Sequence, residues 1–312
     1  MNHEPMRDGY GRAVLELSRE HSDVLVLDAD VAKSTRTEWV REQNPSAFLD
    51  MGISEQDMVG TACGLALAGI TPFLSTYGVF LAGRAWDQIR NTVCYNHLGV
   101  KLAGAHAGIS VGPDGATHQA LEDLALMRVL PGMTVLAPCD SNQTYQATLA
   151  MYRHPGPCFI RFGREAVPVM TAPDEPFVIG KNRRVREGTD VTLFACGAMV
   201  YHAVRAAERL TAQGVSARVV DVGTIKPLDT EDVLRCARET GAAVTCEEHQ
   251  LAGGLGGAIC EALSADMPIP VERVGVQDSF GESGEPGELM QRYGLDADTI
   301  IKAALRAISH KR

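Results

Sequence analysis

Val24-Leu25-Val26-Leu27-Asp28-Ala29-Asp30 is the stretch from which the fold can be worked out. Four consecutive apolar residues follow a helical pattern that runs from about Tyr10 to Arg19, and they end at two acids. A short apolar run with these flanks is typical of a buried strand. Ligands of open α/β sheets lie beyond the carboxyl ends of the strands, so Asp28 and Asp30 are expected at a strand tip that faces a crevice.

The same alternation of strand and helix continues downstream. The patterns predict helices at 55–67, 80–95, 118–129 and 141–153, and strands at 71–74, 100–104, 134–137 and 158–161. A second series has strands at 191–194, 217–220, 243–246 and 271–274, with helices between them. Alternating elements imply mainly parallel sheets covered by helices on both faces. We therefore predict an α/β protein with domains at 1–170 and 187–312, joined by a proline-containing linker at 171–186.

Composition limits the classes of partner. The chain of 312 residues, 45% of them hydrophobic, exceeds the size at which single cores usually divide. A net charge of −10 without a basic cluster argues against nucleic acid or a membrane as the main partner, although a local arginine can still hold a small anion. Eight cysteines without C-x-x-C spacing, and an N-terminus without a secretory pattern, predict buried thiols and a cytoplasmic protein.

The segment from Met58 to Gly83 contains no charged residue. Its length is sufficient to cross a bilayer. However, Pro72 and Ser75 interrupt it, and strand-like and helix-like patterns share it. A protein interior or a subunit interface explains the segment better than a membrane span.

Glu55 begins the predicted helix 55–67, whose following face is apolar. One interpretation is a first-turn acid that the helix dipole favours. The other is a carboxyl group in an uncharged pocket, with a raised pKa that lets it share a proton with a heterocycle. Tyr77 and Phe80 lie in the uncharged segment and are candidates to stack on such a ring, or are ordinary core aromatics.

A glycine-rich loop from Gly104 to Gly115 contains His106 and Asp114 and is followed by His118. Small residues between these side chains allow the backbone or a ligand to approach closely. The spacing matches no common zinc site, so we predict no metal ligands here. The pattern favours substrate binding and proton transfer by the two histidines and the aspartate.

Four motifs carry a family resemblance. They are 52–56 (GISEQ), 114–119 (DGATHQ), 130–135 (LPGMTV) and 138–142 (PCDSN). With them the chain resembles the C-terminal half of transketolase over essentially all 312 residues. The resemblance implies a pyrimidine-binding domain followed by a transketolase C-terminal domain, and thiamine-diphosphate-dependent transfer of a two-carbon ketol unit from a ketose, expected to be phosphorylated, to an aldose.

The resemblance also implies roles for single residues. It implies contact with the cofactor for Glu55, Tyr77, Phe80 and Asp30. It implies binding of the sugar and catalysis, together with Glu55, for His106, Asp114 and His118. It implies contact with the substrate's phosphate for Arg164, Arg7 and Ser34. Pro113 stands where the family often has an acid, and Gly83 where it often has a ring, so the identity of the substrate is less well indicated than the cofactor.

Half of the family's active site is missing from this sequence. The family holds the diphosphate through Mg²⁺ on a Gly-Asp-Gly segment and a downstream asparagine, and no Gly-Asp-Gly occurs here. The resemblance therefore implies a separate N-terminal subunit that supplies the Mg²⁺ ligands. The uncharged segment 58–83 is expected to be buried at an interface, most simply between two copies of this chain in a heterotetramer of two plus two chains, because closed two-fold assembly is the commonest solution for soluble oligomers.

Other interpretations stay open at this point. The β subunit of a 2-oxo acid dehydrogenase has both domains and the glutamate, and a deoxyxylulose-phosphate synthase fragment is a further relative. A non-catalytic assembly subunit is the alternative from another class. The segments 247–249 (EEH) and 253–257 (GGLGG) look catalytic in isolation, but we interpret them as structural or as a subunit contact.

Overall fold

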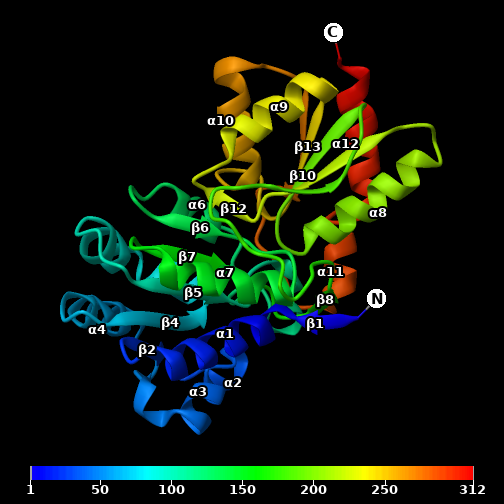
Figure 1. The fold of residues 1–312 in the computed structure, drawn as a ribbon. Coiled ribbons are helices and arrows are strands. Elements are labelled where there is room, and N and C mark those ends of the chain that lie inside the picture. The colour runs from blue at the N-terminus through cyan, green and yellow to red at the C-terminus, as the bar shows by residue number, and fades with distance from the viewer. Residues whose placement is uncertain (1, 312) are drawn as a thin grey trace.

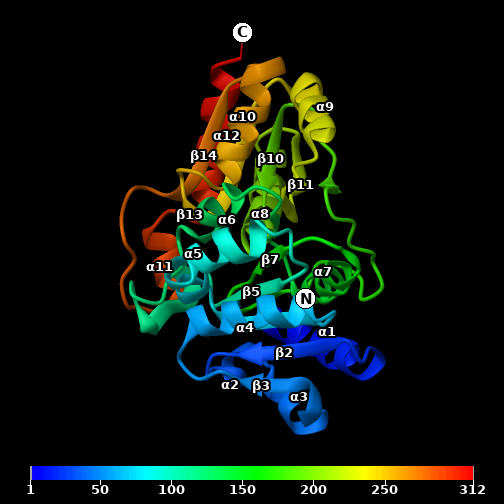
Figure 2. The ribbon, with the colours of Figure 1, turned by 90° about the vertical axis from the view of Figure 1, so that its left-hand side faces the viewer.

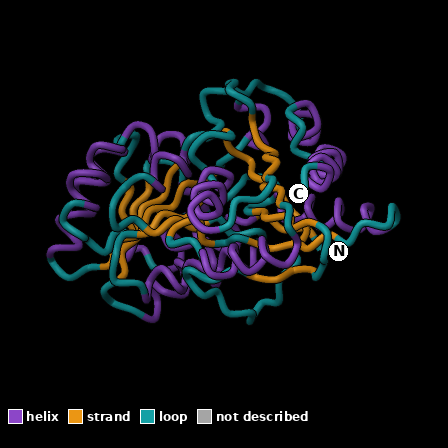
Figure 3. The backbone as a smooth tube through the Cα atoms, turned by 90° about the horizontal axis from the view of Figure 1, so that it is seen from above, coloured by secondary structure: helices purple, strands orange, loops and turns teal. Residues whose placement is uncertain are grey.

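The computed structural model describes residues 2–311 and contains two large sheets surrounded by helices, and a third sheet of only two strands (Figures 1 and 3). The larger sheet has the spatial order β12 (Thr224–Lys226), β6 (Thr134–Leu136), β7 (Cys158–Arg161), β5 (Lys101–Ala105), β4 (Thr71–Tyr77), β2 (Val24–Asp28) and β3 (Phe48–Asp50). Its strands are parallel apart from the edge strand β12, which runs antiparallel to β6.

Helices and a small antiparallel pair of strands complete the first part of the chain. The helical segments are α1 (Met6–Glu20), α2 (Ala32–Thr35), α3 (Glu38–Gln43), η1 (Pro45–Ala47), α4 (Glu55–Leu67), η2 (Phe80–Arg84), α5 (Trp86–Gln88), η3 (Ile89–Cys94), η4 (Ile109–Asp114), α6 (Asp123–Arg128) and α7 (Ser141–Arg153). The separate antiparallel pair consists of strands β1 (His3–Pro5) and β8 (Ala166–Pro168). Helix α4 packs on β4, and α1 packs along α7 (Figures 1 and 2).

The smaller sheet has the spatial order β14 (Val271–Val276), β13 (Ala243–Gln250), β10 (Val191–Ala195), β11 (Ala217–Asp221) and β9 (Arg183–Arg186). The strands are parallel except for β9, which is antiparallel to β11. Its helices are α8 (Met199–Thr211), α9 (Thr230–Thr240), α10 (Leu255–Asp266), α11 (Pro286–Arg292) and α12 (Ala297–Ser309). The predicted α/β class with two mainly parallel sheets is confirmed.

The structure differs from the sequence prediction at the junction of the two sheets. The predicted linker 171–186 includes residues 183–186, but these form β9 at the edge of the smaller sheet. Strand β12 lies between elements of the second part of the chain, yet it pairs with β6 of the larger sheet. One apolar cluster accordingly joins Val135 of β6 to Ile225 and Val233. The two parts therefore share a strand pairing and a core.

Two predicted helices also differ. The helix expected at 80–95 consists of π-helical turns at 80–84 and 89–94 on either side of α5, and such wide turns often occur at functional sites. The helix expected at 118–129 begins only at Asp123. The Gln119 side chain donates instead to the Ile109 and Glu282 carbonyls, and Ala120 bridges to Ala107. These tertiary contacts hold residues 119–120 out of a helix.

The uncharged segment is partly interior and partly surface. Strand β4 is almost entirely buried within the larger sheet. On α4 one face is buried, whereas Gly60, Gly64 and Leu67 are exposed. No helix within residues 2–311 combines the length and the apolar character needed to cross a bilayer. Seven of the eight cysteines are buried and all are free thiols, as predicted.

Candidate active site

Four of the predicted site residues form one cluster of rings. Tyr77 ends β4, and His106 follows β5, the neighbouring strand in the sheet. The Tyr77 ring stacks on His106 at 4.3 Å and on Phe80 at 5.9 Å between centroids. His118 meets the edges of Tyr77 at 5.9 Å and Phe80 at 5.2 Å. The cluster lies at the carboxyl ends of the strands, where sheets of this class bind ligands.

His106 is buried and strained. Its side chain is only 2% exposed, its backbone has a φ of +55°, and its Nδ1 has no hydrogen-bond partner within residues 2–311. Burial lowers the pKa of His106 to about 3, and the charges of Arg7, Arg164 and Arg36 contribute in the same direction. The ring is therefore neutral at physiological pH. A buried neutral imidazole with a free ring nitrogen is suited to accept a hydrogen bond from a bound hydroxyl group.

Three arginines lie near His106, two of which, Arg36 and Arg164, are themselves paired with acids. Arg7, Arg36 and Arg164 are close enough for each of their charges to depress the pKa of His106. Burial lowers the pKa of Arg7 itself, and the charges of Arg36 and Arg164 lower it further. Arg7 donates to the Ser34 carbonyl oxygen at 3.3 Å, while its buried Nε has no partner in the described chain. An unpaired guanidinium N–H beside other cations is a suitable donor for an anion.

Arg164 and Asp114 are paired with each other. The Arg164 Nη1 donates to Asp114 Oδ1 at 3.3 Å and to the Val111 carbonyl at 3.1 Å. Both side chains are about one third exposed, so the pair is accessible to solvent. The family resemblance implies sugar binding for Asp114 and phosphate binding for Arg164. The structure brings both to the glycine-rich loop, where Arg164 also supports the loop backbone.

Glu55 lies at the first turn of α4 and is 2% exposed. Its carboxylate accepts two hydrogen bonds from Arg84 Nη1, at 3.0 and 2.8 Å. The Arg84 guanidinium also lies over the Phe80 ring, 4.6 Å from the centroid. The expectation of an uncharged pocket around Glu55 is therefore wrong, because the first charged residue after the uncharged segment folds back onto it. Arg84 connects Glu55 to the ring cluster.

The contacts of Arg84 show what kind of group fits between Glu55 and Phe80. The guanidinium of Arg84 is a flat, nitrogen-rich group that donates N–H to Glu55 while covering the face of Phe80. A protonated aminopyrimidine is likewise flat and donates N–H at its edge. The arrangement of a buried carboxylate beside an aromatic face therefore fits the ring that the resemblance implies. Arg84 itself is half exposed.

The remaining predicted residues lie along the β2 turn. Ser34 accepts a hydrogen bond from the Tyr77 hydroxyl at 3.3 Å, which connects it to the ring cluster. Asp30 is exposed with a φ of +61°, and its N–H donates to Asp50. The buried acid at this turn is Asp28, which accepts from Thr35, Thr37 and the Val31 N–H. Burial raises the pKa of Asp28 to about 6, although these hydrogen bonds oppose the shift.

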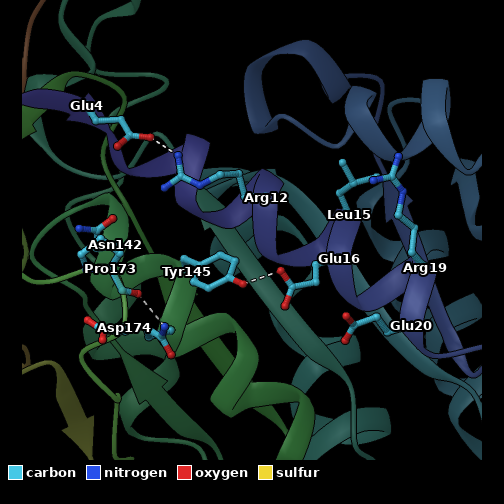
Figure 4. Close-up of a pocket in the computed structure, with 11 residues that line it drawn as sticks. Glu4, Arg12, Leu15, Glu16, Arg19, Glu20, Asn142, Tyr145, Pro173 and Asp174 are labelled. Carbon is cyan, nitrogen blue, oxygen red and sulfur yellow. Dashed lines mark hydrogen bonds and ion pairs between the residues drawn. The ribbon is translucent and has the colours of Figure 1, made fainter.

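A large surface hollow lies elsewhere. It has a volume of about 850 Å³ and is lined by α1 and α7, where the Tyr145 hydroxyl donates to Glu16 (Figure 4). Four acids and two arginines line it, and the ring cluster does not. We assign the site to the ring cluster because it unites a buried imidazole, a buried carboxylate and unpaired polar atoms. Within residues 2–311 no group of three or more histidines, cysteines or acids is placed to hold a metal ion.

Comparisons with known families identify both halves of the chain. Residues 4–170 match the pyrimidine binding domain of transketolase, and residues 180–300 match its C-terminal domain. The chain belongs to the transketolase family. The predicted resemblance is thereby confirmed, as is the order of the two types of domain.

Relatives of this transketolase chain include separate subunits of similar length. It is 40% identical to a 6-deoxy-6-sulfo-D-fructose transketolase subunit of Clostridium sp., over 98% of this chain and 95% of the relative. It is 37% identical to one of the subunits of the apulose-4-phosphate transketolase of Phocaeicola vulgatus, over 97% of each chain. A solved structure described as a split-gene transketolase, an inactive β4 tetramer, shares 47% identity over 99% of each chain, with a TM-score of 0.93. These matches confirm that the chain is of the C-terminal subunit type.

Three residues near this site make contacts that the sequence pattern did not indicate. Arg84 is the first charge after the uncharged segment, and that position was an available signal. Arg36 lies two residues beyond Ser34, in a turn where it pairs with Asp8 at 2.6 Å. Asp28 was predicted at the strand tip but without a function. Arg84 and Arg36 pair with residues far away in the sequence, and Asp28 accepts hydrogen bonds within its own turn. A linear pattern does not reveal either kind of contact.

The lowered pKa of His106 predicts a pH dependence of stability. The unfolded chain protonates this histidine near its ordinary pKa of 6.5, whereas the folded chain does so only near 3. The unfolded state therefore binds more protons between these values, and the free energy of unfolding falls as the pH falls. The slope contributed is about 1.4 kcal/mol per pH unit at most. Urea unfolding at pH 4 to 7 should show a shallower slope for His106→Gln than for the wild type. Equal slopes would contradict the assignment.

Proposed function

We propose that this chain supplies the aminopyrimidine and sugar-binding half of a thiamine-diphosphate transketolase that acts on sugars with a terminal anion. A separate N-terminal subunit would hold Mg²⁺ and the diphosphate. The observation that carries the proposal is the ring cluster, in which neutral His106 stacks on Tyr77 near three arginines and is connected through Phe80 and Arg84 to buried Glu55.

Each side chain has a chemical task in this proposal. When bound, the cofactor supplies the carbon nucleophile for ketol transfer. Glu55 holds the proton shared with the aminopyrimidine nitrogen, with Phe80 against the ring face. His106 accepts a hydrogen bond from a substrate hydroxyl through its unpaired Nδ1. His118, whose Nδ1 is hydrogen-bonded to the Thr117 hydroxyl at 2.9 Å, is oriented to exchange a proton.

The charge around His106 supports an anionic sugar as substrate. Arg7 has an unpaired buried Nε, and Arg164 is accessible beside the glycine-rich loop. The two similar subunits are named for sugars that carry a sulfo group or a phosphate. Both groups are tetrahedral and negatively charged, and guanidinium forks bind them bidentately. The proposal therefore covers either anion at the far end of the sugar.

The proposal also covers how this chain associates with the N-terminal subunit and with a second copy of itself. We place the partner at the face that carries Glu55 and Arg84, because half of the cofactor's contacts have to come from another chain. The exposed side of α4, with Gly60, Gly64 and Leu67, is proposed as a contact between two copies of this chain in a heterotetramer. Asp30 is proposed to lie near the cofactor. We propose that the assembly works in the cytoplasm.

Replacement of Arg164 tests the anion site. In a reconstituted complex, Arg164→Ala is expected to reduce kcat/KM for a phosphorylated ketose about ten- to a hundredfold, because a charge-assisted bidentate contact contributes roughly 1.5–3 kcal/mol. The preference for phosphorylated over unphosphorylated ketose should shrink by the same factor. Cofactor affinity should not change, since Arg164 contacts the glycine-rich loop rather than Glu55.

The assay of Arg164→Ala needs a control variant and an alternative substrate. Arg205→Ala removes an exposed arginine from α8, paired only with Glu208 among its described partners, and should leave the preference intact. Pyruvate offered in place of the ketose distinguishes the rival interpretation, a 2-oxo acid dehydrogenase subunit. Turnover of pyruvate without turnover of any sugar, or an undiminished phosphate preference in Arg164→Ala, would refute the corresponding part of the proposal.

A further inference from the structure

The glycine-rich loop is held from the second domain. Its turn at residues 108–110 faces Glu248, which lies near the end of β13 and is 5% exposed. The Ser110 N–H donates to Glu248 Oε1 at 2.6 Å. Gly108 has a φ of +95°, and a Cβ there would come within 2.3 Å of the Glu248 carboxyl group. The carboxylate therefore lies directly against the turn that follows His106.

A second contact holds the other end of the same loop. Buried Gln119 donates through Nε2 to the Ile109 carbonyl at 3.0 Å and to the Glu282 carbonyl at 2.9 Å. Between the two anchors, a Cβ at Gly115 would lie 2.4 Å from the Ser283 hydroxyl. Residues 106–118, which we call the substrate loop, thus lie against β13 and the segment 282–286 of the second domain.

Buried charge fixes Glu248 in turn. Arg161 from β7 donates to the Glu248 carbonyl at 3.2 Å and to the Ala120 carbonyl at 3.3 Å, and its Nε donates to Asp123 at 2.8 Å. Burial raises the pKa of Glu248, while the Ser110 hydrogen bond and the charge of Arg161 oppose that shift. Burying a carboxylate without a partner costs free energy. The Ser110 N–H on the loop therefore compensates part of the cost of burying Glu248.

The neighbouring glutamate does a different task. Glu247 is fully buried and accepts from the Leu255 and Gly256 N–H groups, both at 2.7 Å, at the start of α10. Successive residues of a strand point to opposite faces, so Glu247 and Glu248 serve different elements. This explains the pair of acids in the segment 247–249, which from the sequence alone we interpret only as structural or as a subunit contact. It also provides a matched control.

We propose that Glu248 is a positioning residue for the substrate loop: from the second domain its carboxylate fixes the turn at 108–110 and so orients His106 and Asp114. The proposal rests on the proposed function for its kinetic consequence. Its structural part, the restraint of the loop, stands on the Ser110 and Gly108 contacts alone. Reacting groups have to be held within about 1 Å, so loss of such a restraint reduces turnover without removing any group that touches substrate.

The first test uses the chain alone and does not depend on activity. Amide hydrogen exchange is measured for wild type, Glu248→Gln and Glu247→Gln. Glu248→Gln keeps an acceptor oxygen but removes its charge, so exchange at Ser110 and its neighbours is expected to accelerate by about tenfold, while the start of α10 stays unchanged. Glu247→Gln should do the reverse. Unchanged exchange at Ser110 in Glu248→Gln would overturn the proposal.

The second test uses the reconstituted complex. Glu248→Gln should reduce kcat about ten- to a hundredfold while the KM for thiamine diphosphate is unchanged, because Glu55 and Phe80 are not touched. Glu247→Gln should keep kcat within about threefold of the wild type. An equal loss of kcat in both variants would assign the effect to general destabilisation and refute positioning. If the wild-type complex transfers no ketol unit, the proposed function fails, and the exchange test alone decides the role of Glu248.

Gly108→Ala provides a further variant in case Glu248→Gln does not fold. Its methyl group enters the same contact from the loop side, because a Cβ there meets the carboxyl group at 2.3 Å. It should lower kcat with an unchanged cofactor KM, as Glu248→Gln does. In the double variant the two effects should be clearly less than additive if they act through one contact. Full additivity would contradict the proposal.

Discussion

The purified chain alone is expected to show no ketol transfer, and addition of an N-terminal subunit with thiamine diphosphate and Mg²⁺ should restore turnover. The reason lies in the site itself. Glu55 is paired with Arg84, and the aminopyrimidine contacts proposed for this chain come without the family's Gly-Asp-Gly segment for the diphosphate. The similar split-gene structure is described as an inactive β4 tetramer, which agrees with this expectation.

The measurement is a coupled assay of ketose donor and aldose acceptor over a titration of the partner subunit. Turnover should rise with partner concentration and saturate at one partner per chain. A variant carrying Glu55→Gln, titrated in parallel, should assemble to the same ratio and remain inactive, which separates assembly from chemistry. Robust activity of the chain without any partner would show that the split interpretation is wrong.

Glu55→Gln is expected to be the most damaging conservative substitution. Glutamine keeps the shape of the side chain and one hydrogen bond, but it cannot share a proton with the aminopyrimidine nitrogen. Turnover should fall by at least about a hundredfold, as is usual for lost acid–base catalysis. The diagnostic signature is slow exchange of the thiazolium C2 proton in the reconstituted complex, measured by NMR on samples quenched at intervals after transfer into deuterated water.

Asp57→Asn is the matched control for Glu55→Gln. Asp57 lies in the same first turn of α4 but is exposed. If Glu55 serves only the helix dipole, both substitutions should cost about 0.3–1 kcal/mol of stability and leave C2 exchange normal. If Glu55 shares the proton, only Glu55→Gln should slow exchange. Wild-type exchange in Glu55→Gln would overturn the catalytic assignment.

Much of the fold can be predicted from the sequence because its periodic segments are long. Helices 55–67 and 141–153 and the strand 158–161 agree with α4, α7 and β7 residue for residue. Helix α7 also has a readable start, since Asp140 accepts from the Gln143 N–H as its cap. The failures are segments whose structure depends on distant partners: β12 pairs with β6, and β9 pairs with β11.

The candidate site, like the fold, has one part that the sequence predicts and one part that it does not. Tyr77, Phe80, His106 and His118 were predicted from motifs and do meet in space, because β4 and β5 are neighbours in the sheet. Of the charges around them, Arg7 and Arg164 were predicted as phosphate contacts, whereas Arg36 and Arg84 were not. Arg84 reaches Glu55 from 29 residues away and Glu248 reaches Ser110 from 138 residues away. A linear pattern shows which side chains are available, whereas pairing across such separations is decided by topology.

The strand β12 has a consequence for how chains of this kind can be divided or recombined. A boundary drawn between residues 170 and 180, where the two family domains meet, leaves Thr224–Lys226 on the far side of the cut from β6. The first piece would then carry an unpaired sheet edge and a bare apolar patch around Val135. Exposed edges of this kind invite association with other chains. A chimera that exchanges C-terminal domains between relatives therefore has to preserve the fit of residues 222–226 to the recipient's sheet, whatever happens at the linker.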